Sequence, residues 1–309
     1  MTVPPTGEQF VLRCAGRDGD TEAVVVEVGG GLRTYRAGGR DLVDGYAEAE
    51  LPVAARGQVL APWPNRLRDG RYRWDGAEHQ TPLSEPETHN AIHGLVRTVA
   101  WQVTGRTSDS VQLEHRLHPQ PGYPFALRLQ IGYELSPGGL HVRTTATNVG
   151  DEPLPYGEGH HPYLAARPGQ HVDDCTLVAP GATRLETDER ALPTGAVDVT
   201  GTRYDLRAGR PIGDLVIDHC FTDLARDDDG LAWARLTGPD GRGAAVWLDE
   251  GYGHLQLFTG DVLPEPWRRR GVAVEPMTCP PDAFATGDSV IRLEPGESTT
   301  ASWGITPIG

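Results

Sequence analysis

The sequence predicts an all-β protein that folds as a large antiparallel β-sandwich. Its 39 Gly and 26 Pro are spread along the 309 residues and divide the chain into many short segments separated by turns. The segment FALRLQIGYEL, residues 125–135, places an apolar or aromatic side chain at every second position, and a period of two is typical of a half-buried strand. No segment has a persuasive helical period. Many short strands with few helices favour packed antiparallel sheets.

The predicted strands follow one another as short apolar runs bounded by Gly, Pro, Asp or Ser. The first clear run is 23–28, and the run 111–117 precedes the alternating segment 125–135. After the turn SPGG the alternation continues through 139–150, so this segment is predicted to form a hairpin with 125–135. Further strands are predicted at 244–249, 254–259, 271–276 and 289–295.

Helix is expected only as isolated turns, at 46–53 and at 281–287. The chain contains no internal repeat and no Ser/Gly linker that would divide it. Residues 1–309 are therefore predicted to form a single domain, a length that one all-β domain can reach. Residues 1 to about 15 are expected to fray, as chain ends often do.

Charge and composition bear on the partners. The 28 Lys+Arg against 43 Asp+Glu leave a formal net charge of −15, which repels phosphate backbones and anionic lipid, so neither nucleic acid nor membrane is expected as a partner. The opening MTVPPTGEQF lacks the basic and apolar regions of a signal peptide, and no apolar run reaches about 18 residues. A cytoplasmic protein is expected. The four cysteines form no C-x-x-C pair and are expected to be separate thiols: Cys14, Cys175, Cys220 and Cys279.

Residues suited to chemistry gather in the segments 62–72, 90–97, 159–164 and 273–284. In the first, Pro64-Asn65-Arg66 interrupts an extended stretch and fixes a guanidinium whose donors can bind several oxygens in one plane. A surface salt bridge is the alternative interpretation. In the second, His93 precedes Gly94, whose missing side chain lets another group approach closely. A core histidine bonded to a backbone carbonyl is the alternative there.

The third segment contains two adjacent histidines, His160 and His161. Neighbouring side chains on extended chain project to opposite faces, so only one of the two rings can face a cleft. Glu158 is the only carboxylate close by. The two histidines are therefore not expected to bind one metal ion together.

In the fourth segment, Glu275 follows the apolar run 271–274 and precedes Pro276, so its carboxylate is expected at the end of a buried strand. Burial would raise its pKa and a nearby arginine would lower it. A charge at such a position indicates a functional role.

Taken in order, these motifs resemble the aldose 1-epimerase (mutarotase) family over nearly the whole chain. Asn65-Arg66, His93-Gly94 and His161-Pro162-Tyr163-Leu164 look like the family's Asn-Arg, His-Gly and His-Pro-Tyr-Phe motifs. Glu275-Pro276, with Pro280-Pro281-Asp282-Ala283-Phe284 after it, looks like the context of the family's late glutamate. The words VIDHCF and HLQLFTGD are similar to two shorter family segments and contain Asp218 and Gln256. The segments PWPNRLRDGRY and AIHGLVR resemble those of a bacterial subgroup of the family, which has uncertain sugar specificity and is related to sulfosugar epimerases.

The resemblance implies a galactose mutarotase-like supersandwich whose concave sheet holds a sugar, and an enzyme that interconverts the α and β anomers of a free aldose. It implies His161 as general acid and Glu275 as general base. An imidazole with a pKa near neutrality suits such proton transfer. It implies substrate contacts for Asn65, Arg66, His93, Tyr163, Asp218 and Gln256. A small-molecule sugar is the expected partner, no cofactor is required, and both a monomer and a homodimer are compatible with the sequence.

Other functions stay open. A hexose-6-phosphate 1-epimerase would need cations to meet the phosphate, and the candidates are Arg66, Arg68, Arg71 and Arg73. Alternation would send Arg71 and Arg73 to solvent. A non-catalytic carbohydrate-binding protein would not need an acid opposite a base, and a metal-dependent jelly-roll isomerase would lose its activity on chelation. A core or rim position is favoured over a sugar-stacking role for Trp63, Trp74 and Trp267.

Overall fold

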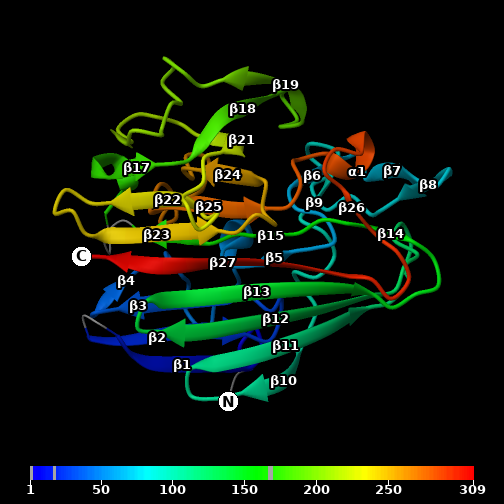
Figure 1. The fold of residues 1–309 in the computed structure, drawn as a ribbon, viewed down its shortest axis with the longest axis horizontal. Coiled ribbons are helices and arrows are strands. Elements are labelled where there is room, and N and C mark those ends of the chain that lie inside the picture. Colours follow the sequence, from blue (N-terminus) through cyan, green and yellow to red (C-terminus); the bar gives the residue numbers. More distant parts are fainter. Residues whose placement is uncertain (1–2, 17–18, 166–169) are drawn as a thin grey trace.

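A computed structural model describes residues 3–16, 19–165 and 170–309, and in it the protein is built from antiparallel sheets, as predicted (Figure 1). The largest sheet has nine strands, in the order β10 (Gln102–Arg106), β11 (Ser110–Leu117), β12 (Leu127–Ser136), β13 (Gly139–Asn148), β27 (Ser298–Ile308), β23 (Gly243–Leu248), β22 (Ala232–Thr237), β17 (Thr176–Val178) and β20 (Arg210–Pro211).

A second sheet has eight strands and positions most of the polar residues predicted to act on a substrate. Its order is β19 (Pro193–Asp198), β18 (Gly181–Thr187), β21 (Asp218–Leu224), β24 (His254–Phe258), β25 (Gly271–Met277), β15 (Gly159–His160) and β5 (Val59–Leu60), with β16 (Tyr163–Ala165) also paired to β25.

Smaller sheets and short helical turns complete the fold. The four-stranded sheet consists of β1 (Gln9–Gly16), β2 (Gly19–Val26), β3 (Leu32–Ala37) and β4 (Arg40–Asp41). The two-stranded ladders are β6 (Arg66–Arg68) with β9 (Asn90–Ile92), β7 (Arg71–Trp74) with β8 (Ala77–Gln80), and β14 (Leu154–Tyr156) with β26 (Ile291–Leu293). The helical turns are η1 (Val53–Ala55), η2 (Val172–Asp174) and α1 (Ala283–Thr286).

The hairpin predicted from alternation is present as β12 and β13, which pair from Leu127 opposite Asn148 to Ser136 opposite Gly139. The expected fraying of residues 1 to about 15 is wrong from Gln9 onward. Strand β1 pairs with β2 along its whole length, and Phe10 and Leu12 are buried in the core. Paired backbone and buried side chains fix this segment, and its closeness to the terminus does not loosen it.

One hydrophobic core joins the two large sheets. It includes Leu129 and Ile131 of β12 together with Leu255 and Leu257 of β24, all fully buried. Because side chains alternate along a strand, Gln256 must project from the opposite face of β24. That face carries the candidate site.

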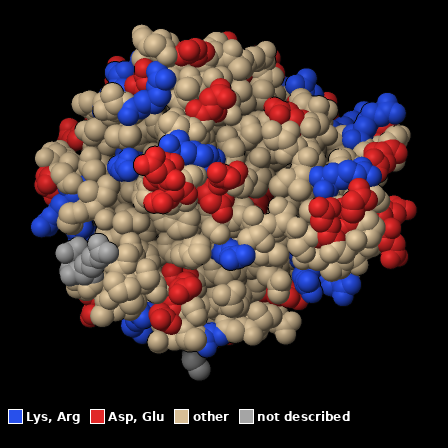
Figure 2. Space-filling model, in the orientation of Figure 1, with Lys and Arg blue, Asp and Glu red and all other residues tan. Residues whose placement is uncertain are grey.

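Acidic and basic side chains are interspersed over the face that Figure 2 shows, without a continuous basic area. In the part of the chain that the structure describes, no helix has the length and apolar character needed to cross a membrane.

Candidate active site

A cavity of about 370 Å³ lies over β21, β24 and β25 and is bordered by the segments around residues 54–66 and 84–97. All eight residues predicted to act on a substrate line it: Asn65, Arg66, His93, His161, Tyr163, Asp218, Gln256 and Glu275. The structure therefore brings together residues that are as much as 210 positions apart in sequence, from Asn65 to Glu275. A pocket of this size is within the usual range for small-molecule sites.

The Asn-Arg and His-Gly motifs meet across a short ladder. Strands β6 and β9 pair with Arg66 opposite Ile92, and the His93 amide donates to the carbonyl of Asn65 at 2.8 Å. Gly94 has a φ of 66° and lies so close to the Ala61 carbonyl that a Cβ would come within 2.0 Å of its oxygen. Glycine is therefore required here to let His93 reach the cavity.

The hydrogen bonding of His93 determines its protonation. Its Nδ1 accepts a hydrogen bond from the Asn65 backbone amide at 3.1 Å, so the proton of the neutral ring must be on Nε2. Burial lowers the pKa of His93 well below 6.5, and the nearby His161 and Arg97 lower it further. His93 is thus a neutral hydrogen-bond donor.

His161 and Glu275 are in direct contact. Nε2 of His161 lies 3.3 Å from Oε1 of Glu275, and the side chains are 6% and 2% exposed. Burial lowers the pKa of His161 to about 3, with the charges of Arg56 and Arg97 adding to the effect. Burial also raises the pKa of Glu275, reinforced by Asp218 and opposed by Arg66. The expectation of a near-neutral imidazole pKa is therefore wrong for His161, because burial disfavours its charged form, whereas the rise in the pKa of Glu275 agrees with its expected burial. The protein favours the uncharged form of each group.

Two buried acceptors beside this pair have no hydrogen-bond partner among the described residues. They are Oε2 of Glu275 and Oε1 of Gln256. The amide of Gln256 donates to Oδ1 of Asp218 at 2.7 Å, which fixes the orientation of its free oxygen. Unpaired buried acceptors are costly, and a ligand in the cavity that supplies hydrogen-bond donors could satisfy these two.

Tyr163 supports His161 from behind. The two rings stack with centroids 5.0 Å apart, and the guanidinium of Arg56 covers Tyr163 at 3.9 Å. Arg56 is buried, bonded to Asp44 at 2.7 Å, and lies against Trp267. The Tyr163 hydroxyl donates to the Ala54 carbonyl at 3.1 Å. This column of stacked groups fixes the plane of the His161 ring.

The four arginines considered for phosphate binding do not gather in the cavity. Arg66 lines it but is paired with Glu85 at 2.8 Å, and Arg68 is paired with Asp282 at 3.1 Å. Arg71 and Arg73 are exposed on β7, as alternation predicts.

Arg97 is the cavity cation that the sequence analysis missed, although it ends the motif that contains His93. Its Nη2 donates to the Ile92 carbonyl at 3.3 Å, and no carboxylate pairs with it among the described residues. Burial lowers the pKa of Arg97. The charge of Glu85 acts on Arg97 from beyond ion-pair distance, and a partly buried guanidinium that no described carboxylate contacts can accept an anion from a ligand.

His160 faces the opposite side of the sheet, as extended geometry predicts. Its Nε2 lies 3.0 Å from the Thr144 hydroxyl, and its ring packs against Trp303. Nearby, the buried carboxyl of Glu158 accepts hydrogen bonds from the hydroxyls of Tyr156 at 2.6 Å and Tyr252 at 2.9 Å. His160 therefore belongs to a polar cluster inside the core.

Within the described residues, no group of three or more His, Cys, Asp or Glu has an arrangement that could hold a metal ion. The cavity lining includes none of Trp63, Trp74 and Trp267.

The cavity on the β-sandwich thus contains a buried imidazole–carboxylate pair together with unpaired hydrogen-bond acceptors, an arrangement that can bind a small polar ligand and exchange protons with it. Residues 14–306 match the sequence model of the family described as aldose 1-epimerase, and the chain belongs to this family. Membership supports a sugar epimerase, an isomerase.

The chain is also similar to individual proteins and to solved structures. The chain is 36% identical over 292 residues to the uncharacterised protein YihR of Escherichia coli (strain K12), covering 93% of this chain and 92% of that protein. It is 32% identical over 187 residues to galactose mutarotase of Rattus norvegicus, covering 56% of this chain and 52% of that protein. The fold is similar to the solved structure of a GalM/aldose epimerase homologue from C. elegans, with a TM-score of 0.84, 20% identity and coverage of 97% and 98%.

Proposed function

We propose that this protein is an aldose 1-epimerase that interconverts the α and β anomers of a free aldose, with His161 as general acid and Glu275 as general base. The observation that carries the proposal is the buried contact between these two side chains, 3.3 Å apart, beside acceptors without partners. A sugar supplies several hydroxyl donors to such acceptors. A protein that only binds sugar has no need for an acid in contact with a base.

The contact suits the reaction because the two oxygens that exchange protons, O1 and O5, are bonded to one carbon. Glu275 takes the O1 proton while His161 gives a proton to O5, so the C1–O5 bond breaks and C1=O1 forms. Rotation about C1–C2 exposes the other face of the aldehyde. The reverse transfers close the ring as the other anomer and return both groups to their starting forms.

Burial influences where the working proton resides before the reaction. The uncharged pair carries one proton on the carboxyl of Glu275, and the ion pair carries the same proton on His161. Their contact lets the proton pass directly between the two side chains when the polar sugar and Arg66 favour the ion pair. The enzyme then needs no proton from solvent to begin a turnover.

The remaining residues would orient the ring. Nε2–H of His93 donates to a ring-side oxygen, and Arg66 offers Nη1, since its Nε and Nη2 bind Glu85. The free oxygen of Gln256 and the carboxyl of Asp218 accept from sugar hydroxyls. Tyr163 acts from the wall of the cavity, through its stacking on His161.

The test is anomer exchange of α-glucose and α-galactose, followed by polarimetry and by NMR. Glu275→Gln and His161→Gln should each lower kcat/KM by about 100-fold or more, the usual contribution of a positioned acid or base. His141→Gln, on β13 of the nine-stranded sheet and outside the cavity lining, is the control and should leave the rate unchanged. Exchange at the wild-type rate in either cavity variant would refute the assigned roles. Sugar binding without exchange by the wild-type protein would favour the carbohydrate-binding alternative.

Arg97 favours a second candidate, an epimerase for an aldose with an anionic substituent. Its guanidinium lines the cavity without a carboxylate partner among the described residues, so a sulfonate or phosphate on the sugar would supply the missing charge. The test compares free hexoses with a C6-sulfonated sugar and a hexose 6-phosphate, in wild type and in Arg97→Gln. A preference for the anionic sugar that Arg97→Gln abolishes would support this candidate, and equal rates on neutral and anionic sugars would contradict it.

A further inference from the structure

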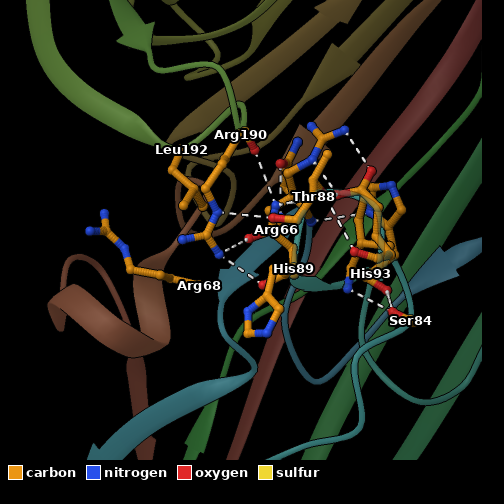
Figure 3. A network of polar contacts seen from close by, with 12 residues as sticks. Arg66, Arg68, Ser84, Thr88, His89, His93, Arg190 and Leu192 are labelled. Carbon is orange, nitrogen blue, oxygen red and sulfur yellow. Dashed lines mark hydrogen bonds and ion pairs between the residues drawn. The ribbon is translucent and has the colours of Figure 1, made fainter.

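A second arginine, Arg190, lies outside the cavity and binds the segment that orients Arg66. Arg190 is in the turn between β18 and β19, and Figure 3 shows it beside Thr88 and His89, with Arg66 in the same network. Its Nε donates to the Thr88 carbonyl at 2.9 Å, and its Nη2 donates to the His89 carbonyl at 2.8 Å and to Oδ1 of Asp69 at 2.9 Å. One guanidinium thus fixes two successive backbone carbonyls.

Asn90 strengthens this attachment from the other side. Its side chain is fully buried. It accepts from Nη2 of Arg190 at 3.2 Å and donates to the Arg190 carbonyl at 3.1 Å. The same amide nitrogen donates to Oε2 of Glu85 at 3.3 Å and to the Thr88 hydroxyl at 3.0 Å. The bonds therefore lead from Arg190 through Asn90 to Glu85.

Glu85 connects Asn90 to Arg66, which lines the cavity. Its two carboxylate oxygens accept from Nε and Nη2 of Arg66 at 2.8 and 2.9 Å, and Thr88 donates to Oε2 as well. A bidentate arginine–carboxylate pair fixes the plane of both groups. Since one edge of the Arg66 guanidinium is occupied, only Nη1 remains fully available to a ligand, and its direction is set by Glu85.

Hydrogen bonds within the turn that contains Arg190 stabilise its backbone. Oδ1 of Asp188 accepts from the amides of Arg190 at 2.9 Å and Leu192 at 3.0 Å, and the Leu192 side chain is buried. The Asp188 amide donates to the Leu192 carbonyl at 3.0 Å. The backbone of Arg190 is consequently fixed by the turn itself, independently of the residues that its side chain binds.

We infer that Arg190 is a positioning residue for Arg66, acting at a distance of more than 100 residues of sequence through Asn90 and Glu85. The inference rests on the proposed function, because it assigns Arg190 an effect on the same reaction. A positioning role differs from a purely structural role in one measurable way. The effect of removing Arg190 must disappear when Arg66 is already absent.

The experiment is a double-mutant cycle of Arg190→Gln and Arg66→Gln, read as kcat/KM for anomer exchange. Arg190→Gln should lower kcat/KM by about 10-fold, since small displacements of a substrate-positioning group are costly. Arg66→Gln should lower it further, and the double variant should match Arg66→Gln. Arg190→Lys, which keeps the charge and loses the planar fork, should recover only part of the loss.

Arg292→Gln is the matched control. Arg292 also joins distant parts of the chain through a carboxylate, Asp75, at 2.8 and 2.9 Å, but contacts no residue of the network. Its removal should leave kcat/KM unchanged. Losses that multiply in the double variant, or equal losses in Arg190→Gln and Arg292→Gln, would overturn the inference.

A second measurement separates this inference from the proposed function. Hydrogen–deuterium exchange of the amides of residues 85–92 in the free protein should become faster in Arg190→Gln and stay unchanged in Arg292→Gln. Unchanged exchange in Arg190→Gln would overturn the inference even in an active enzyme. If the wild-type protein exchanges no anomers, the proposed function fails, and faster amide exchange would still support the connection from Arg190 to the cavity.

Discussion

Glu158 makes the stability of this protein depend on pH in a predictable direction. Its carboxyl is buried in the core, and burial raises its pKa from 4.5 to about 7, although hydrogen bonds from Tyr156 and Tyr252 oppose the rise. A folded-state pKa above the unfolded value means that the folded protein binds the proton more tightly. The stabilising contribution is therefore complete below pH 4.5 and is lost as the pH rises through about 7.

The size of the effect follows from the shift. A rise from 4.5 to about 7 corresponds to about 3 kcal/mol, at roughly 1.4 kcal/mol per pKa unit. Glu158→Gln replaces the carboxyl by an amide of the same shape that does not titrate. The free energy of unfolding of Glu158→Gln minus that of the wild type should therefore increase by about 3 kcal/mol between pH 4.5 and pH 8.

Urea unfolding at a series of pH values measures this difference, and equal m-values would confirm that the two denatured states are comparable. Other titrating groups affect both proteins alike and cancel. Glu134→Gln, at an exposed position on β12, is the control and should show no such increase. A difference that stays constant over this pH range, or that decreases as the pH rises, would refute the reasoning.

Three other predictions concern the cavity and its support. Because burial lowers the pKa of His161 to about 3, its pair with Glu275 should not gain a second proton as the pH falls from 7 to 5, and kcat/KM should stay level. A decline centred near 6.5 in an NMR pH–rate profile would show that an ordinary imidazole takes up that second proton. Gly94→Ala should destabilise the protein by about 3 kcal/mol in urea unfolding and lower kcat/KM, because the new Cβ would lie 2.0 Å from the Ala61 carbonyl oxygen at a φ of 66°. Arg56→Met should cost about 3 kcal/mol by leaving Asp44 buried with one fewer partner, and an unchanged urea midpoint would contradict this.

The sequence was informative where a residue type is demanded by local geometry or by chemistry. Alternation predicted β12 and β13 because a half-buried strand requires it. It did not predict β27, the strand between β13 and β23, because Ser298–Ile308 mixes Ser, Thr, Gly and Pro with apolar residues and forms a strand through its two neighbours.

The candidate site was predicted as a set of residues, but its electrostatics were not. All eight residues line one cavity, yet the pKa of His161 depends on how completely neighbouring segments exclude water, which no motif records. Arg190 and Glu85 were missed for a related reason. Their partners are about 100 and 19 residues away along the chain, and nothing near either residue in the sequence indicates the contact.

The fold permits only one register for the segment that carries His160 and His161. A displacement of the strand by one residue in one direction would put His160 into the cavity position, and in the other direction it would put His161 beside Trp303 and Pro162 into the cavity position. Gly159 opposes both displacements, because either Glu158 or His160 would then take its position, where a Cβ would lie 2.8 Å from the Pro276 carbonyl oxygen and 3.0 Å from Cβ of Pro64. Neither side chain fits that place, so the glycine that precedes the pair decides which of two identical side chains meets Glu275.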